Sequence, residues 1–412
     1  MKNLKKVFQI IVTTVMVNAS GMAQTWTVGE DIPQAFRASN VAAHKSTSTN
    51  SGYLFLISGR DSEGNITPRN QRYDISNNVW EDMAPAPTGI LGASTAIVKD
   101  SIYIIGGLTS TPGTAIKKVR RYSINQNTWA DKADFPVNIV DTDAVSYQDS
   151  LIYVTAGYNS RVRVFNAITN KWRDATPMTS PLQSIAWGAL TIHGNKLVYM
   201  CGTNALFSPN YFNTVRIGTI DQNNRANITW TTGTPFPGQT RTFFDAHSWN
   251  GGIIMTGGST DNTFDTNSDE CYFYNVDTDV WTQLPSKPTA WVTGNSASLN
   301  IDNEWKLICA SGYNNGGYLY STEIYTETQL SRDEFASEPQ INFFPNPTNG
   351  FLQFDTSELV KEIICYDMHG KAINLKIISN NTLDVSNLAQ GVYLIKVIGE
   401  NDKIVSAKFV KN

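Results

Sequence analysis

The chain has 412 residues, of which 41% are hydrophobic and 17% are charged, so it can bury a large core and form more than one domain. Its formal net charge of −4 gives no electrostatic reason to expect nucleic-acid binding. The 29 glycines, 10 tryptophans and 17 tyrosines are typical of an all-β protein with many tight turns.

The first 23 residues have the three parts of a secretory signal peptide. Lys2, Lys5 and Lys6 give a positive start, residues 7–17 are mostly apolar, and small residues precede Gln24. We expect cleavage after Ala23 and a mature protein outside the cytoplasm. No later run of 18 apolar residues occurs, so the mature chain is not expected to span a membrane.

A phrase recurs through residues 24–328: an apolar strand, a glycine, a second strand, a tryptophan and a proline. The phrase glycines are Gly59, Gly107, Gly157, Gly202, Gly258 and Gly312, and the tryptophans are Trp80, Trp129, Trp172, Trp230 and Trp281. The first and last glycines are 253 residues apart, which gives a period of about 51 residues. We expect the tryptophans to pack between successive repeats; the alternative is that they stack on a ligand.

With its glycine doublets (Gly106–Gly107 and Gly257–Gly258), the Tyr73–Asp74 pair and the spaced tryptophans, this region resembles the kelch family. The resemblance implies a β-propeller. No tryptophan follows the Gly312 phrase, whereas Trp26 precedes the first phrase. We therefore predict six blades, with residues 24–29 pairing with residues 322–326 to complete the sixth and remove exposed sheet edges.

Residues 329–340 are polar and charged and predict a linker, and short strands with Asn/Gly turns predict a small β-sandwich over residues 341–412. This segment is similar to the type A sorting domain of the type IX secretion system of Bacteroidota. The matching motif residues are Pro345, Asn346, Pro347, Gly391 and Tyr393. The resemblance implies that the secretion machinery is a partner and that the protein is secreted or displayed on the outer cell surface. The alternative is an accessory sandwich.

The loops between second and third strands and the loops between blades are expected on one face of the propeller. They are rich in arginine, asparagine and aromatic residues, which suits a polar ligand. The candidate ligand-binding residues are Arg37, Arg60, Arg161, Arg241, Trp291 and Tyr313. Arg37 and Arg241 are assigned to equivalent blade-junction positions. The alternative for each residue is an ordinary solvated loop position.

No catalytic residue is identified, and no cofactor or metal is expected. The four cysteines form no zinc pattern or disulfide framework. His44 and His247 lie near innermost strands, but no third ligand accompanies them for the copper site of galactose oxidase-like propellers. The carboxylates Asp141, Asp143, Asp261, Asp265 and Glu270 are the candidates for acid–base glycoside chemistry.

The sequence therefore favours an exported monomeric propeller that binds an extracellular glycan or protein through its loop-rich face. The alternative function is a carbohydrate-active enzyme, such as a sialic-acid mutarotase or epimerase, and it rests on the six-bladed architecture alone. A third class is an adhesion module without a small-molecule pocket.

Overall fold

The computed structural model describes residues 23–46, 51–110, 112–155, 157–205, 210–328, 342–355, 360–368, 370–379, 381–399 and 404–412. The chain forms two compact units, divided between Gln329 and Leu330. The predicted signal peptide, except for Ala23, and the predicted linker beyond Thr328 lie outside the described residues. Within the described part of the chain, no helix has the length and hydropathy of a membrane span.

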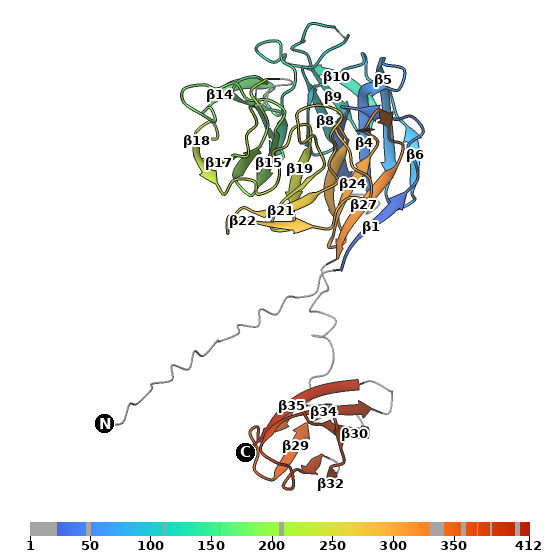
Figure 1. The fold of residues 1–412 in the computed structure, drawn as a ribbon, viewed down its shortest axis with the longest axis vertical. Helices are drawn as coiled ribbons and strands as arrows, with labels where there is room; N and C mark the ends of the chain where they lie inside the picture. Colours follow the sequence, from blue (N-terminus) through green and yellow to red (C-terminus); the bar gives the residue numbers. More distant parts are fainter. Residues whose placement is uncertain are drawn as a thin grey trace, which may run out of the picture. The chain divides into compact units, whose positions relative to one another are not determined.

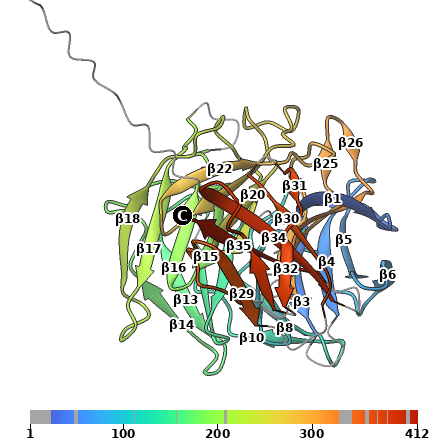
Figure 2. The same ribbon diagram turned by 90° about the horizontal axis from the view of Figure 1, so that it is seen from below.

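The first unit is built from six antiparallel sheets (Figures 1 and 2). Five of them follow chain order: β3 (Asn40–Lys45), β4 (Gly52–Asp61), β5 (Ile66–Asp74) and β6 (Val79–Asp82); β7 (Ser94–Val98), β8 (Ser101–Ile105), β9 (Val119–Ser123) and β10 (Thr128–Lys132); β11 (Ala144–Tyr147), β12 (Leu151–Thr155), β13 (Val162–Asn166) and β14 (Lys171–Ala175); β15 (Ala189–His193), β16 (Lys196–Met200), β17 (Val215–Ile220) and β18 (Ile228–Gly233); β19 (Asp245–Trp249), β20 (Gly252–Thr256), β21 (Cys271–Asn275) and β22 (Val280–Leu284). These are blades one to five of a propeller. In Figure 2 the fourth blade runs from β18 at the outside to β15 nearest the centre.

The sixth blade combines both ends of the first unit. It contains β23 (Ser296–Ile301), β24 (Glu304–Ala310) and β27 (Thr322–Thr328), and its outermost strand is β1 (Ala23–Gly29). Figure 1 shows β1 in blue alongside β27 in orange, and Trp26 lies opposite Tyr325 in the antiparallel register. The predicted closure of a six-bladed ring by the N-terminal strand is confirmed.

Burial follows strand position within each blade. The second strands β8, β12, β16 and β20 are almost wholly buried because both of their faces pack against neighbouring blades. The innermost strands, such as β7, alternate between buried and partly exposed residues because every second side chain faces the central channel. The core is thus divided among the spaces between blades.

Each outer-strand tryptophan joins its blade to the preceding one. The indole N–H groups donate to backbone carbonyls just beyond the neighbouring outer strand: Trp26 to Pro285, Trp80 to Glu30, Trp129 to Ala84, Trp172 to Ala133, Trp230 to Thr176 and Trp281 to Thr234, at 2.9–3.1 Å. The hydrogen bonds continue around all six blades. The predicted packing of the tryptophans between blades is confirmed.

Glycines of the repeated phrase allow close contact between blades. Gly257 has φ +69°, and a Cβ at this position would lie 1.9 Å from the indole nitrogen of Trp291. A side chain here would therefore clash as well as strain the backbone.

The second unit has two four-stranded sheets, with the order β28-β29-β33-β32 and β31-β30-β34-β35. The strands are β28 (Asn342–Phe344), β29 (Phe351–Asp355), β30 (Val360–Tyr366), β31 (Ala372–Ile373), β32 (Lys376–Ser379), β33 (Thr382–Asp384), β34 (Gly391–Gly399) and β35 (Ile404–Lys411). Leu352, Leu383, Ile395 and Phe409 are fully buried between them. This is a small sandwich with its own core.

Candidate functional site

A ring of left-handed residues surrounds one mouth of the central channel. Each inner strand is preceded by a residue with φ between 47° and 64°: Ala38, Gly92, Asp141, Trp187, Phe243 and Thr293. Backbone N–H groups bond around the ring, from Asp141 to Gly92, Phe243 to Trp187, Thr293 to Phe243 and Ala38 to Thr293, at 2.9–3.3 Å. For the five non-glycine residues this conformation costs about 1–2 kcal/mol each, and such strain clusters at functional sites.

These six residues line a cavity of about 420 Å³, here called the mouth pocket. Its wall also includes Arg37, Arg60, Asp143, Asp245 and Phe264. The mouth pocket therefore collects two guanidinium groups, two large aromatic rings of the left-handed ring and several carboxyl groups in one concave surface. Sites with this composition bind small polar ligands.

Arg37 and Arg60 form the cationic side of the mouth pocket. They lie opposite one another in register where β2 (Phe36–Arg37) pairs with β4. The Arg37 guanidinium lies 4.9 Å from the ring centre of Phe264 and 5.2 Å from that of Tyr313, which begins β25 (Tyr313–Asn314) in a hairpin with β26 (Gly317–Tyr318). The two rings fix the guanidinium plane without neutralising its charge, and they leave it able to bind an anion.

An arc of aromatic rings extends from Phe264, which lies beside Arg37, to Tyr158. Ring centres are 5.4 Å apart for Tyr158 and Trp187, 5.0 Å for Trp187 and Phe243, and 5.2 Å for Phe243 and Phe264. The rings come from blades three, four and five, so each blade contributes to one continuous apolar ledge. Such a ledge can pack against the apolar face of a ligand while the arginines bind its polar groups.

Two aspartates form the floor of the mouth pocket. Asp143 and Asp245 line both this pocket and the channel cavity of about 370 Å³ beneath it. Burial raises the pKa of Asp143 to about 8, with further contributions from the neighbouring Asp245 and Asp141 carboxylates. Burial also raises the pKa of Asp245 to about 7, against the opposing effect of its hydrogen bonds from Ser296. Burial therefore favours the neutral form of both carboxyl groups of the floor.

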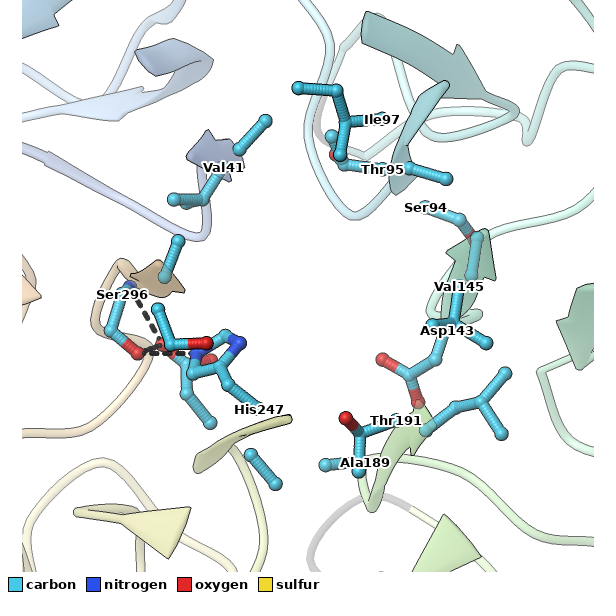
Figure 3. Close-up of a pocket in the computed structure, with 18 of the residues that line it drawn as sticks. Val41, Ser94, Thr95, Ile97, Asp143, Val145, Ala189, Thr191, His247 and Ser296 are labelled. Carbon is cyan, nitrogen blue, oxygen red and sulfur yellow. Dashed lines mark hydrogen bonds between the residues drawn. The ribbon is translucent and has the colours of Figure 1, made fainter. Parts of the chain in front are cut away.

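A hydrogen-bond chain leads from this floor into the channel. The Ser296 amide and hydroxyl groups each donate to Asp245 Oδ2 at 2.8 Å, and His247 Nε2 lies 2.8 Å from Ser296 Oγ. Burial lowers the pKa of His247 to about 4, so the ring is neutral at pH 7. Figure 3 shows Asp143 and Thr191 on one side of the channel and His247 and Ser296 on the other. The order of groups differs from a Ser-His-Asp triad, because serine lies between the other two.

The six predicted binding residues occupy three different environments. Arg37, Arg60 and Tyr313 come together at the mouth pocket as described. Arg161 lies outside the mouth pocket, in a separate cavity beside blade three. Arg241 and Trp291 are buried, with 1% and 2% of their surface exposed.

Arg241 and Trp291 have structural roles. The Arg241 guanidinium donates to the Gly257 carbonyl at 3.0 Å, to the Ser268 hydroxyl and to the Glu270 carboxylate. Trp291 packs under Gly257, with the Lys287 ammonium 4.5 Å from its ring centre. Burial excludes both side chains from a ligand-contacting surface, which corrects the expectation for these two positions.

The assigned equivalence of Arg37 and Arg241 is wrong by one residue. Arg37 directly precedes the left-handed residue Ala38, whereas Arg241 lies two residues before Phe243. The β-bridges confirm this alignment. Arg37 pairs with Arg60 in blade one, and Thr242, which directly precedes the left-handed residue of blade five, pairs with Ser259. The position of Arg241 is buried in every blade, where it is occupied by Phe36, Ile90, Ile139, Ile185, Arg241 and Trp291.

The sequence-based prediction did not select Trp187, Phe243, Phe264 or Asp245. Phe243, Phe264 and Asp245 lie in loops expected on the binding side, but no sequence pattern distinguishes them from the other residues of those loops. Trp187 and Phe243 are identified by their positive φ angles in the structure. Glycine is the residue that indicates a positive φ angle in a sequence, and neither position is a glycine.

The other candidate groups are occupied by local contacts. His44 pairs with Asp100 at 3.2 Å, and Asp261 accepts hydrogen bonds from Ser259 and Thr263. Within the described ranges, no three His, Cys, Asp or Glu side chains gather as metal ligands would. The four cysteines are buried and unpaired.

The motif residues of the second unit lie near its C-terminal strand. The Asn346 side chain donates to the Lys408 carbonyl and accepts from the Val410 amide, which places the segment with Pro345 and Pro347 beside β35. Gly391 begins β34, and the Tyr393 ring lies 5.4 Å from that of Phe409. The motif therefore joins the first strands of the unit to its last one.

Comparisons with known proteins agree with both units. The Kelch motif family model matches residues 91–136, and the model of the secretion system C-terminal sorting domain matches residues 342–412. The chain is a kelch-repeat propeller protein with a C-terminal secretion sorting domain. The sorting domain indicates export through the type IX secretion system to the cell surface or the extracellular space.

The kelch propeller also resembles individual proteins. It is 27% identical over 161 residues to Kelch-like protein 35 of Mus musculus, covering 38% of this chain and 28% of that protein. It is 32% identical over 82 residues to Kelch-like protein 38 of Homo sapiens, covering 20% of this chain and 13% of that protein. The match thus spans less than a third of either relative. A solved structure titled "Structure of YjhT" has a TM-score of 0.56 at 16% identity, covering 71% of this chain and 95% of that one, which shows a shared fold.

Proposed function

We propose that this protein is a secreted or surface-displayed binding protein whose mouth pocket holds a glycan with an acidic group. The observation that carries this proposal is the Arg37 guanidinium, fixed between the rings of Phe264 and Tyr313 and directly opposite Arg60. Arg37 and Arg60 both line the pocket, and guanidinium groups provide planar donors that match a carboxylate. The aromatic ledge, which begins at Phe264 beside Arg37, provides an apolar surface for the face of a sugar ring.

A glycan array with acidic and neutral glycans tests this proposal. We expect the wild-type protein to bind acidic glycans, and Arg37→Ala and Arg60→Ala each to weaken binding at least tenfold. Arg173→Ala is the matched control, because Arg173 is an exposed arginine of β14 outside both cavities. Undiminished binding by a folded Arg37→Ala, Arg60→Ala double variant would refute the proposed site.

A second candidate function is a carbohydrate-active enzyme of the sugar mutarotase or epimerase type. The observation that favours it is the pair of floor aspartates, because Asp143 and Asp245 are two carboxyl groups with raised pKa values in one pocket and are candidates for a general acid and a general base. Anomer exchange of N-acetylneuraminate, followed by NMR, tests this function. Acceleration that disappears in Asp143→Asn and Asp245→Asn variants would favour the enzyme over the binding protein, and an unchanged exchange rate would reject this enzyme.

The export route completes the proposal. Residues 1–23 act as a signal peptide, and residues 341–412 are recognised by the type IX machinery of a member of the Bacteroidota. The propeller acts as a monomer. Fractionation of cells that express the chain with and without residues 341–412 tests the route, since only the full chain is then expected on the surface or in the medium.

A further inference from the structure

A second cavity of about 520 Å³ lies beside blade three, next to the mouth pocket. Its lining includes Val137, Asn138, Val140, Tyr158, Asn159 and Arg161. These residues come from the junction of blades two and three and from the loop after β12. The junction also supplies Asp141 and Asp143 to the mouth pocket. We call this second cavity the rim pocket.

A thin wall separates the two cavities. The Tyr158 hydroxyl donates to Asp141 Oδ2 at 3.0 Å, and its ring packs on Trp187, so Tyr158 of the rim pocket contacts two residues of the mouth pocket. Gly157 allows this approach, since a Cβ there would lie 2.2 Å from the Val140 carbonyl oxygen. Tyr158 is 41% exposed, so a ligand crossing the wall would touch its ring.

The rim pocket contains a guanidinium group available for an anion. Arg161 is exposed, and among the described residues no carboxylate lies within ion-pair distance of it. Its backbone amide bonds to the Asn159 side chain at 2.8 Å, which fixes the loop. The neighbouring Arg163, in contrast, is bound to Asp174 at 2.8 Å and lies over the Phe135 ring. Arg161 is thus the residue of this pair that can bind a ligand.

We infer that the mouth pocket and the rim pocket are adjoining subsites for one oligosaccharide with at least two acidic units. This inference rests on the proposed function and extends it from a single sugar to a chain. Arg37 and Arg60 bind the acidic group of one unit, Arg161 binds that of another, and the Tyr158 ring lies under the linkage between them. The aromatic ledge, which includes the Tyr158 ring, favours a glycan over an acidic peptide, because sugar rings offer broad apolar faces.

Array binding with acidic oligosaccharide ladders tests the inference. The probes are galacturonate, mannuronate and N-acetylneuraminate chains of one to six units, with oligoglutamate as the peptide competitor. We expect wild-type affinity for one ladder to rise at least tenfold from one unit to longer chains. Arg161→Ala should abolish this gain, Arg37→Ala should weaken binding at every length, and Arg173→Ala should behave like the wild type.

The outcomes separate this inference from the proposed function. Equal affinity for short and long chains, or an Arg161→Ala variant that retains the full length dependence, overturns the two-subsite arrangement while the mouth pocket stands. Wild-type protein that binds no acidic glycan refutes the proposed function and this inference with it. Oligoglutamate that competes as strongly as the best ladder overturns the assignment to a glycan. Circular dichroism and thermal unfolding establish that each variant is folded.

Discussion

Arg37 and Arg241 lie one position apart in the repeat of the propeller, and this single step places one at the mouth pocket and the other in the core. Arg37 directly precedes the left-handed residue of its blade junction, whereas Arg241 lies two residues before its counterpart. Successive side chains along an extended segment point to opposite faces. Two arginines in similar-looking loops therefore have opposite roles.

This difference predicts opposite effects of alanine substitution. Arg241→Ala leaves Glu270 and Ser268 without their buried partner and is expected to lower the free energy of unfolding by about 1–3 kcal/mol. Arg37→Ala removes only ring contacts at a partly exposed site and is expected to lower it by less than ~1 kcal/mol. Urea denaturation followed by tryptophan fluorescence measures both. A larger loss for Arg37→Ala would contradict the assigned positions.

The floor aspartates predict a progressive loss of stability as pH rises from about 4 to about 8. Folding raises the pKa of Asp143 from 3.8 to about 8, so the folded state binds more protons than the unfolded state between these values. The contribution of Asp143 to the free energy of unfolding is complete below about pH 4 and is lost as pH rises toward 8. The contribution of Asp245 is lost as pH rises from about 4 toward 7. We expect the Asp143→Asn, Asp245→Asn double variant to show a flatter dependence of Tm on pH over this range. Identical slopes for the variant and the wild type would show that neither carboxyl group titrates abnormally.

Removal of the closing strand should open the propeller. Deletion of residues 23–29 leaves the edge of β27 unpaired and removes the Trp26 hydrogen bond to Pro285, so we expect a lower Tm and self-association through the exposed edge. Size-exclusion chromatography and thermal unfolding measure these effects. Val28→Ala is the control within the same strand, because Val28 is 71% exposed and should be dispensable. A monodisperse deletion variant with unchanged Tm would contradict this role of β1.

Two glycines with similar backbone angles predict different costs of substitution. Gly257 and Gly251 have φ values of +69° and +74°, but a Cβ on Gly251 would meet no atom within 4 Å, whereas one on Gly257 would clash with Trp291. Gly251→Ala should therefore cost about 1–2 kcal/mol from backbone strain alone. Gly257→Ala adds the displacement of a buried indole and should cost several-fold more. Equal decreases in the free energy of unfolding for Gly251→Ala and Gly257→Ala, measured by urea denaturation, would indicate that the Trp291 side chain can move to accommodate a Cβ.

The blades could be predicted because their determinants are local and repeated. Glycines such as Gly107 and tryptophans such as Trp129 recur about once every 50 residues, and the outer-strand tryptophans have the same structural role in all six blades. The closure was predictable because the Gly312 phrase lacks a tryptophan while Trp26 has no preceding strands. Antiparallel pairing of Trp26 with Tyr325 then follows from the geometry of a closed ring.

The site could be predicted only in part. The candidates Arg37, Arg60 and Tyr313, which the structure brings together, could be selected from the sequence because arginine and tyrosine are conspicuous in loops expected on the binding side. Trp187 and Phe243 were missed because a left-handed conformation in a non-glycine residue is imposed by the surrounding ring of backbone hydrogen bonds. Arg241 is buried because it lies one residue earlier in its blade junction than Arg37 does in its own. The loops differ in length, so this one-residue difference cannot be aligned from the sequence.

The pairing of β1 with β27 also sets an order of events during synthesis. A ribosome makes Trp26 about 300 residues before Tyr325, so the earliest strand has no partner until the end of the propeller emerges. The sorting domain, at residues 342–412, is made later still. Every chain that carries the sorting domain therefore already contains β27, the strand that pairs with β1 to complete the sixth blade. Chains that terminate before residue 342 lack the sorting domain.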